Sequence, residues 1–264
     1  MLTANRQLNL LLAAAIALLG TSTAHAADSP RWHTVRRCGP FLLHSEFALE
    51  PYLPQIRRLE ELPARFHKTL DLPVTDQPIE VHLLSNRRRY RDHVRRRVPQ
   101  AVKRRALYLK TRDRGYVFAY RHDDWGQDLL HECTHALIHN ALPYLPLWLD
   151  EGLAEYFERP ASTAAGPHPH LRRLRWSMRL GWNPSLKRLE SRRSFSEITA
   201  GDYREAWAWV HFLLHGPPKA RQALADYLAA IRNGRPPGHF SRFLQTRLPS
   251  AAGQVKTHLA QLTR

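Results

Sequence analysis

The sequence predicts an α+β protein, with a small mixed or antiparallel sheet and helices in an N-terminal lobe and a mostly helical C-terminal lobe. The chain has 264 residues, 43% apolar and 24% charged, which is globular composition with enough length to bury a core. Runs with strand character lie before residue 121. After residue 124 apolar residues recur at helical spacing, so we expect a helix at the seam between the lobes.

The first 26 residues have the pattern of a cleaved signal peptide. Arg6 is the one charge in residues 1–9, residues 10–20 are apolar, and Ala24-His25-Ala26 supplies the small residues that signal peptidase needs. An uncleaved membrane anchor is the alternative, although the apolar run has about half of the ~20 residues that span a bilayer. We therefore expect a soluble bacterial protein that is periplasmic or secreted.

The N-terminal lobe is expected to occupy residues 27–143 and to begin with a strand pair. Residues 32–48 alternate in polarity and are broken at Gly39-Pro40, which indicates two short strands joined by a turn. Residues 52–70 carry an apolar stripe at helical spacing. A helix should therefore follow the strand pair.

Three more strands are expected before the seam helix. PIEVHLL at residues 78–84 is β-branched and apolar, and Ser85 or Asn86 can cap a helix after it. Residues 105–110 and 116–120 flank a run of turn residues, so they should form a β-hairpin.

The C-terminal lobe, residues 144–264, is expected to be helical. The stretch 159–184 is rich in Pro, Ser, Gly and Arg and should be its loosest part. The helices expected from apolar spacing, including the one at the seam, cover residues 127–140, 147–158, 202–215, 218–232, 240–247 and 251–262.

The chain is strongly basic, with a formal net charge of +17, and its densest basic cluster is NRRRYRDHVRRRV at residues 86–98. Tyr90, Val94 and Val98 recur there at helical spacing, so we expect an amphipathic helix with its arginines in solvent. The alternative is a patch that binds anionic polymers of the cell envelope. Nucleic acid is not an expected partner, because the chain has no zinc-finger or aromatic-basic strand motif.

Two cysteines, Cys38 and Cys133, would meet an oxidising compartment after export, where a disulfide between them is allowed. Cys133 lies on the side of its expected helix that faces away from His131 and His135. We therefore favour a buried free thiol over a bridge.

The stretch DLLHECTHALIHN, residues 128–140, contains HECTH. On a helix His131 and His135 lie one turn apart, about 5.4 Å, so both imidazoles can reach one metal ion. Glu132 lies alongside and can take a proton from a metal-activated water. Because random order gives such a match about 4% of the time in a chain of this composition, the interpretation requires a third ligand. His139 is too far along the helix to supply it and is expected to be structural or to support a ligand.

Candidate third ligands follow in LPLWLDEGLAEYFE, residues 145–158. Pro143 and Pro146 end the first helix and allow the chain to reverse, so the next helix can pack against it. Glu151 and Glu155 are one turn apart on a shared face. The spacing alone does not choose between these two carboxylates.

HECTH followed by WLDEGLAEY resembles the gluzincins of the peptidase MA clan, and in particular the small peptidase-MA-like bacterial proteins of largely unknown function. The likeness is specific over residues 128–158 and weaker across the rest of the C-terminal lobe. It implies one zinc ion per chain, with Glu151 as the third ligand beside the two histidines. It also implies that Glu132 is the general base and that the carboxylate of Glu155 hydrogen-bonds a ligand histidine.

The same resemblance suggests an oxyanion donor and a substrate-binding strand. In GDYREAWAWVHFLLH, Asp202 and Glu205 are expected to form a capping box that starts a helix at Tyr203, which is similar to the catalytic tyrosine of aminopeptidase gluzincins. His211 is the competing donor, unless it is a core histidine. The strand at residues 116–120 is expected to be the edge strand that pairs with a peptide.

Together these features predict an exported zinc-dependent metallohydrolase, a peptidase that acts on peptide or protein substrates. The alternative is a non-catalytic exported protein with a structural or vestigial metal site and a basic surface that binds anionic envelope polymers. The intact Glu132 favours the enzyme, because a purely structural site needs no base.

Overall fold

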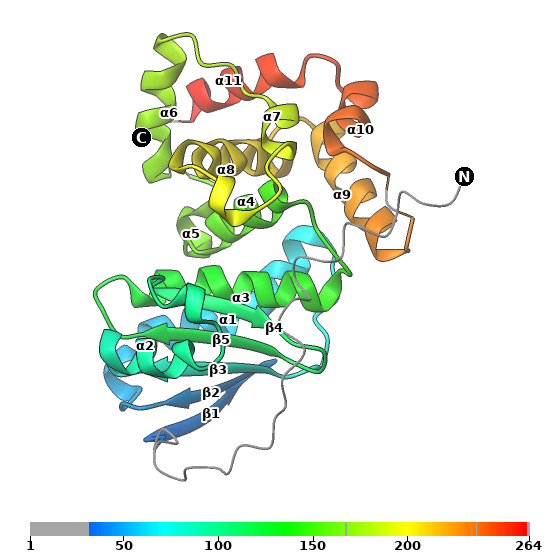
Figure 1. The fold of residues 1–264 in the computed structure, drawn as a ribbon. Helices are drawn as coiled ribbons and strands as arrows, with labels where there is room; N and C mark the ends of the chain where they lie inside the picture. Colours follow the sequence, from blue (N-terminus) through cyan, green and yellow to red (C-terminus); the bar gives the residue numbers. More distant parts are fainter. Residues whose placement is uncertain (1–31, 167, 236, 263–264) are drawn as a thin grey trace. The chain divides into compact units, whose positions relative to one another are not determined.

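The computed structural model describes residues 32–166, 168–235 and 237–262, and these residues form the expected α+β fold (Figure 1). The expected signal peptide, residues 1–26, lies outside the described residues. The strands are β1 (Thr34–Cys38), β2 (Phe41–Ser45), β3 (Ile79–Leu84), β4 (Ala106–Lys110) and β5 (Gly115–Tyr120). They form one mixed sheet in the order β1-β2-β3-β5-β4, with antiparallel pairs at both ends and parallel pairs in the middle.

Each helix expected from apolar spacing is present, and two further helices lie in the described part of the stretch 159–184 that we expected to be loosest. None of the described helices is long and apolar enough to cross a membrane. The helices are α1 (Leu53–Leu70), α2 (Arg87–Arg95), α3 (Trp125–Ala141), α4 (Leu147–Phe157), α5 (Ala161–Ala164), α6 (Pro169–Arg179), α7 (Leu186–Glu190), α8 (Ala200–His215), α9 (Pro218–Arg232), α10 (Phe240–Arg247) and α11 (Ala251–Gln261).

The expected hairpin is confirmed, but the prediction that residues 116–120 are its edge strand is wrong. β5 pairs with β3 on one side and with β4 on the other. Within the described residues β4 pairs with β5 alone, so β4 is the edge strand, and it packs against α3. Local patterning could not show this order, because it depends on the parallel pairing of β5 with the distant β3.

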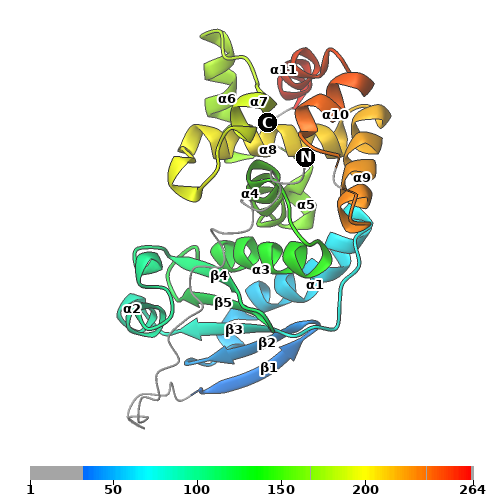
Figure 2. The same cartoon turned by 45° about the vertical axis from the view of Figure 1, so that its right-hand side comes forward.

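Alternation along the strands divides the sheet into two faces. Side chains such as Leu43, Val81 and Val117 belong to the main core, which α1 and α3 share over one face (Figures 1 and 2). Cys38 and Cys133 are also buried in this core and both are free thiols, as expected for Cys133. This face therefore fixes α3 against β4 and β5.

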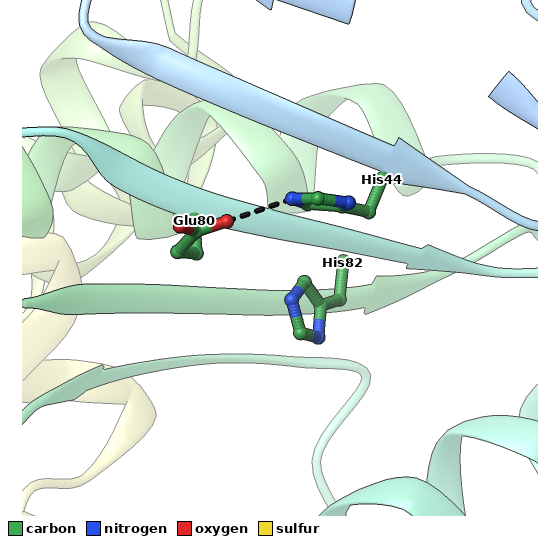
Figure 3. A group of neighbouring side chains, drawn as sticks. All are labelled: His44, Glu80 and His82. Carbon is green, nitrogen blue, oxygen red and sulfur yellow. Dashed lines mark hydrogen bonds and ion pairs between the residues drawn. The ribbon is translucent and has the colours of Figure 1, made fainter. Parts of the chain in front are cut away.

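The opposite face is only partly apolar. α2 covers one end of it, where Tyr90 and Val94 pack in a cluster with Phe118, which confirms the expected amphipathic helix. The side chain of Asn86 caps α2 by accepting the backbone N–H of Arg89 at 3.0 Å. The middle of the face instead carries three polar side chains on β2 and β3 (Figure 3), namely His44, Glu80 and His82.

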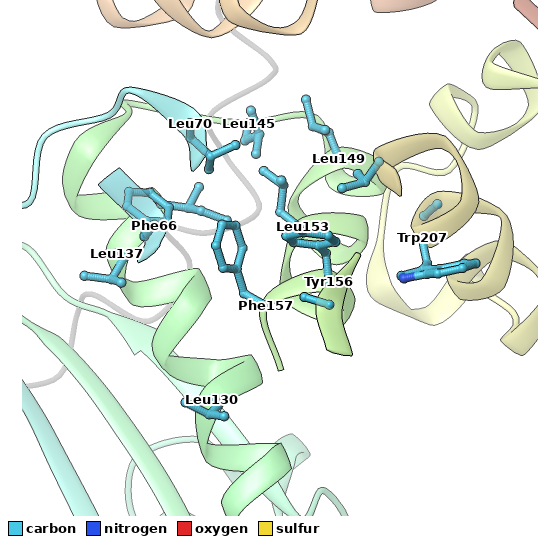
Figure 4. Packing of buried hydrophobic residues seen from close by; sticks show 14 of the residues in the cluster. Phe66, Leu70, Leu130, Leu137, Leu145, Leu149, Leu153, Tyr156, Phe157 and Trp207 are labelled. Atoms are coloured by element: carbon cyan, nitrogen blue, oxygen red, sulfur yellow. The ribbon is translucent and has the colours of Figure 1, made fainter. Parts of the chain in front are cut away.

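α4 is the link between the sheet-containing part and the C-terminal helices. It packs against α3 on one side and against α8 on the other. Figure 4 shows Leu149, Leu153 and Phe157 of α4 inside the apolar cluster, and all three are fully buried. Burial of this stripe leaves the remaining face of α4 free to carry its carboxylates.

The contact between α4 and α8 requires a glycine at position 152. A Cβ atom there would lie 2.7 Å from the carbonyl oxygen of Ala206 and 2.8 Å from Cγ2 of Val210. We expect Gly152→Ala to lower the free energy of unfolding by roughly 1–3 kcal/mol through overpacking, as measured by urea unfolding. Gly253→Ala in α11 is the matched control, because a Cβ there meets nothing within 4 Å. It should stabilise the protein by up to about 1 kcal/mol, and equal effects of the two variants would contradict this account.

α8 begins at Ala200, one turn earlier than expected. The N-cap is Thr199, whose hydroxyl accepts the N–H of Asp202 at 3.2 Å, while the Asp202 carboxylate accepts the N–H of Thr199 at 3.0 Å. Glu205 accepts hydrogen bonds from the N–H of Ser185 and the indole of Trp182. The predicted capping box of Asp202 with Glu205 is therefore wrong, and Glu205 instead fixes the segment before α7.

Candidate metal centre

α3 and α4 bring together the three side chains that were expected to bind a metal. His131 and His135 lie one turn apart on α3, with ring centroids 4.9 Å apart. Glu151, on α4, points at both of them: its carboxylate oxygens lie 3.4 Å from Nε2 of His131 and 3.8 Å from Nε2 of His135. One donor atom from each of the three residues lies within 4.8 Å of the other two.

This donor set fits a metal ion. Glu151 is 2% exposed, and its Oε2 atom is buried without a hydrogen-bond partner. Two atoms that ligate one tetrahedral zinc ion at about 2.0–2.1 Å are about 3.4 Å apart. The distance of 3.4 Å between Oε2 of Glu151 and Nε2 of His131 equals this separation and is too long for a good hydrogen bond.

Two other carboxylates orient the histidine rings. Oδ1 of Asp150 lies 2.9 Å from Nδ1 of His135, and Oε2 of Glu158 lies 3.0 Å from Nδ1 of His131. A carboxylate at Nδ1 places the proton there and leaves the Nε2 lone pair free for a metal. Both histidines therefore present Nε2 toward Glu151.

Glu155 makes a different contact from the one expected. Its Oε2 atom lies 3.0 Å from Nε2 of His170, near the start of α6, whereas Glu158 occupies the position beside His131. Glu155 remains near the centre, because one of its oxygens lies within 4.8 Å of donor atoms of both His131 and Glu158. The carboxylate that orients the first histidine is therefore one turn further along α4 than we expected.

His139 supports the centre indirectly. Its Nε2 atom lies 3.0 Å from Oδ2 of Asp150, whose other oxygen contacts His135. Burial alone would raise the pKa of Asp150, but the two histidines on its oxygens hold that pKa well below its usual value. Sequence reasoning missed the roles of Asp150 and Glu158. The rule that a ligand histidine usually has a carboxylate on its second nitrogen could have suggested Asp150, next to Glu151.

Asp150 provides a test of this orienting role. We expect Asp150→Asn to weaken metal binding at this centre about 10- to 100-fold, because the amide cannot hold His135 as a carboxylate does. Competition with a chromophoric zinc chelator measures the change. Asp128→Asn is the matched control on α3, since Asp128 pairs with Arg105 and His122. An Asp150→Asn variant with the affinity of the control would contradict the assignment.

The carboxylates also raise the pKa of the two histidines. Burial lowers the pKa of each ring, but Glu151 and Glu158 raise that of His131 well above its usual value, and Asp150 and Glu151 raise that of His135 to about 9. A metal must displace protons from these nitrogens, so its affinity should fall as the pH is lowered.

The side chain of Glu132 extends from α3 to the edge strand β4. It is 9% exposed, and its Oε2 atom accepts the backbone N–H of Tyr108 on β4 at 2.6 Å. The carboxylate is therefore held beside the edge strand β4, one residue from the first candidate ligand.

Tyr203 of α8 lies near Glu151. It lines a small pocket together with Glu151 and Trp148. Burial, with a further contribution from the Glu151 carboxylate, raises the pKa of Tyr203 to about 12. Its hydroxyl therefore stays protonated and can donate a hydrogen bond throughout the ordinary pH range.

His211 is a core histidine and not a competing donor at the centre. It is fully buried on α8, with Nδ1 2.8 Å from Nε2 of His258 and Nε2 3.1 Å from the carbonyl oxygen of Ala165. Burial, together with His215 and His258, lowers its pKa to about 3.

The lowered pKa of His211 predicts a loss of stability in mild acid. Between about pH 6.5, the usual histidine pKa, and about 3, the unfolded chain binds a proton that the folded chain does not, so stability falls as the pH falls. At pH 4.5 this should cost about 2–3 kcal/mol relative to pH 7, measured by urea unfolding with a chelator present. His211→Phe should reduce that difference. His33→Asn, at an exposed position, should not. Identical pH dependence of wild type and His211→Phe would contradict the prediction.

Comparison with known proteins adds one finding. Residues 128–237 are similar to a family described as a protein of unknown function (DUF1570). A comparison with curated proteins found no match. The matched segment contains the elements that form the centre, including His131, Glu132, His135, Glu151 and Tyr203.

Proposed function

We propose that this chain is an exported zinc-dependent metallohydrolase, a peptidase of the gluzincin type. The carboxylate of Glu151 carries the proposal, because it is 2% exposed and one of its oxygens is unpartnered beside His131. A buried carboxylate oxygen that accepts no hydrogen bond costs free energy unless a cation lies beside it. HECTH next to this carboxylate favours zinc among the ions that accept such donors.

The residues around the centre suggest how hydrolysis would proceed. His131, His135 and Glu151 would hold the zinc ion, which would supply Lewis-acid activation of water and of the scissile carbonyl. Glu132 accepts the proton of the attacking water at its carboxylate and returns it to the leaving amine. Tyr203 donates its hydroxyl hydrogen bond to the oxyanion of the tetrahedral species.

The edge strand provides a route for an extended peptide. β4 has no strand partner on its outer side among the described residues, and its Tyr108 N–H binds Glu132. Because Glu132 occupies that N–H, a peptide would pair with the other outward backbone groups of β4. It would then lie beside the general base without requiring a particular side chain. This geometry favours an extended peptide as the substrate.

Zinc analysis together with a cleavage assay tests the proposal. The purified protein should retain zinc at the centre and should cleave members of a peptide library only when zinc is present. Export predicts that the N-terminus of the protein recovered from the periplasm or medium is Ala27. A zinc-loaded preparation with no hydrolysis of any library peptide would contradict the enzymatic assignment.

A non-catalytic exported protein is the second candidate. The hydrogen bond from Tyr108 to Glu132 also fits a structural role for that carboxylate. On this account Glu132→Gln would leave the cellular role intact. Charge reversal of the exposed Arg87, Arg88 and Arg91 on α2 would abolish it instead, because binding would depend on the basic surface.

A further inference from the structure

A second group of metal-ligating side chains lies on the sheet face that α2 partly covers, away from α3. His44 on β2 and His82 on β3 are direct partners in the parallel register, and Glu80 precedes His82 by two residues. Alternation along a strand therefore puts all three side chains on one face, as Figure 3 shows. We call this group the sheet-face triad.

The triad is compact and mostly buried. One donor atom from each of the three residues lies within 4.8 Å of the other two, and Nε2 of His44 lies 2.7 Å from Oε2 of Glu80. Glu80 is 8% exposed and His82 is 9% exposed. Because the three residues stand on hydrogen-bonded strands, the rigid sheet fixes their relative positions.

Neighbouring side chains orient the triad. Nδ1 of His82 lies 3.0 Å from Nε2 of His93, and Arg114 donates to Oε1 of Glu80 at 2.9 Å. These contacts occupy the far nitrogen of His82 and one oxygen of Glu80. Nε2 of His82 is not used by these contacts, and Oε2 of Glu80 contacts Nε2 of His44. This is the arrangement expected for ligands supported by an outer layer of hydrogen bonds.

Trp32 closes one side of the group. Its ring centroid lies 4.9 Å from that of His82 and 5.4 Å from that of His44. Nε2 of His44 carries the proton that the Glu80 carboxylate accepts, and Nδ1 of His44 is buried without a partner. A metal ion at the triad would replace that proton between Nε2 and Glu80, and the proton of the neutral ring would then be on Nδ1.

We propose that His44, Glu80 and His82 bind a divalent first-row transition-metal ion. This site is separate from the candidate centre of His131, His135 and Glu151, which we call the HECTH centre. Two imidazoles and one carboxylate are a donor set that zinc, iron and related ions accept, with further positions open to water or another ligand. An ion pair with Glu80 explains the position of His44. It does not explain why the imidazole of His82 is buried next to them, since Nε2 of His82 has no hydrogen-bond partner within the described part of the chain. The site goes beyond the proposed peptidase function and does not depend on it.

Zinc stoichiometry tests the proposal. Protein purified without a histidine tag is dialysed against buffered Zn²⁺, and the metal is measured by mass spectrometry. Wild type should bind about two zinc ions per chain, one at each site. His82→Gln should bind about one fewer and keep its peptide hydrolysis. His33→Gln, an exposed histidine near the same strands, should match wild type. Equal zinc content in wild type and His82→Gln would overturn the proposal.

Glu151→Gln separates this proposal from the proposed function. If Glu151→Gln loses one zinc ion and His82→Gln loses the other, both sites exist. If only His82→Gln loses zinc, the sheet-face triad binds metal and the HECTH centre fails. If only Glu151→Gln loses zinc, the triad is a hydrogen-bonded network without a metal, and the inference is overturned while the peptidase proposal stands.

Trp32 fluorescence tests the proposal independently, should His82→Gln fail to fold. Cu²⁺ bound at the triad should quench Trp32, because the indole is in contact with two of the ligand rings. Addition of Cu²⁺ should therefore quench wild-type emission more strongly than that of Trp32→Phe, a variant that keeps all three ligands. Equal quenching in the two proteins would overturn the proposal.

Discussion

Glu132→Gln is expected to lower peptide hydrolysis by about 10²- to 10⁴-fold while the protein keeps its zinc. Glutamine has nearly the same shape, and its amide oxygen can still accept the N–H of Tyr108, which Glu132 binds at 2.6 Å. It cannot take a proton from water at neutral pH. The variant therefore removes the proposed general base and leaves the fold and the proposed ligands in place.

The measurement pairs initial rates on one library peptide with zinc content and thermal melting. Glu61→Gln is the matched control, because Glu61 is exposed on α1. It should retain wild-type rates. A Glu132→Gln variant that hydrolyses peptide at the wild-type rate would remove Glu132 from the mechanism and would favour the non-catalytic alternative.

Glu151→Gln is expected to weaken zinc binding at the HECTH centre by more than about 100-fold, which exceeds the loss expected for a residue that only orients a ligand. Glu151 is the one carboxylate that lies within 4 Å of Nε2 of both histidines among the described residues. The amide keeps the volume of this buried side chain but loses the negative charge that a divalent ion requires. Hydrolysis should fall with the zinc content.

Glu155→Gln is the comparison that separates the two glutamates of WLDEGLAEY. Its carboxylate contacts His170 and neither of the two ligand histidines through a hydrogen bond. It should therefore lose less than about tenfold in zinc affinity, below the range for a carboxylate that orients a ligand. Chelator competition measures the zinc affinity of both variants. A larger loss in Glu155→Gln than in Glu151→Gln would exchange the two roles.

The parts of the fold with strong local periodicity were predictable from the sequence. α3 and α4 follow from apolar spacing and two prolines, and their antiparallel packing brought His131, His135 and Glu151 together as expected. β1 and β2 followed from alternation around Gly39, whose φ of 58° suits the turn. Local rules decide these features, so a single sequence was enough.

The features that were mispredicted or missed depend on contacts between distant segments. The edge position of β4 follows from the pairing of β5 with β3. The choice of Glu158 over Glu155 as the partner of His131 depends on how α4 is rotated against α3, and His170 then takes Glu155. Acids that follow one another at helical spacing share a face, so the sequence alone does not specify which of them contacts a given histidine.

The sheet-face triad illustrates the same limit. His44 and His82 are 38 positions apart in the sequence and become neighbours only through the register of β2 with β3. A shift of one residue in that register would turn one ring to the other face of the sheet. The sheet-face triad therefore depends on long-range strand pairing, and no local sequence motif predicts it.

The most direct test of the HECTH centre is X-ray diffraction from crystals of the zinc-loaded protein, recorded on both sides of the zinc absorption edge. The account predicts an anomalous peak bonded to Nε2 of His131, Nε2 of His135 and the carboxylate of Glu151, at about 2.0–2.2 Å from each. An anomalous map of the zinc-loaded crystal with no peak between these three side chains would contradict it.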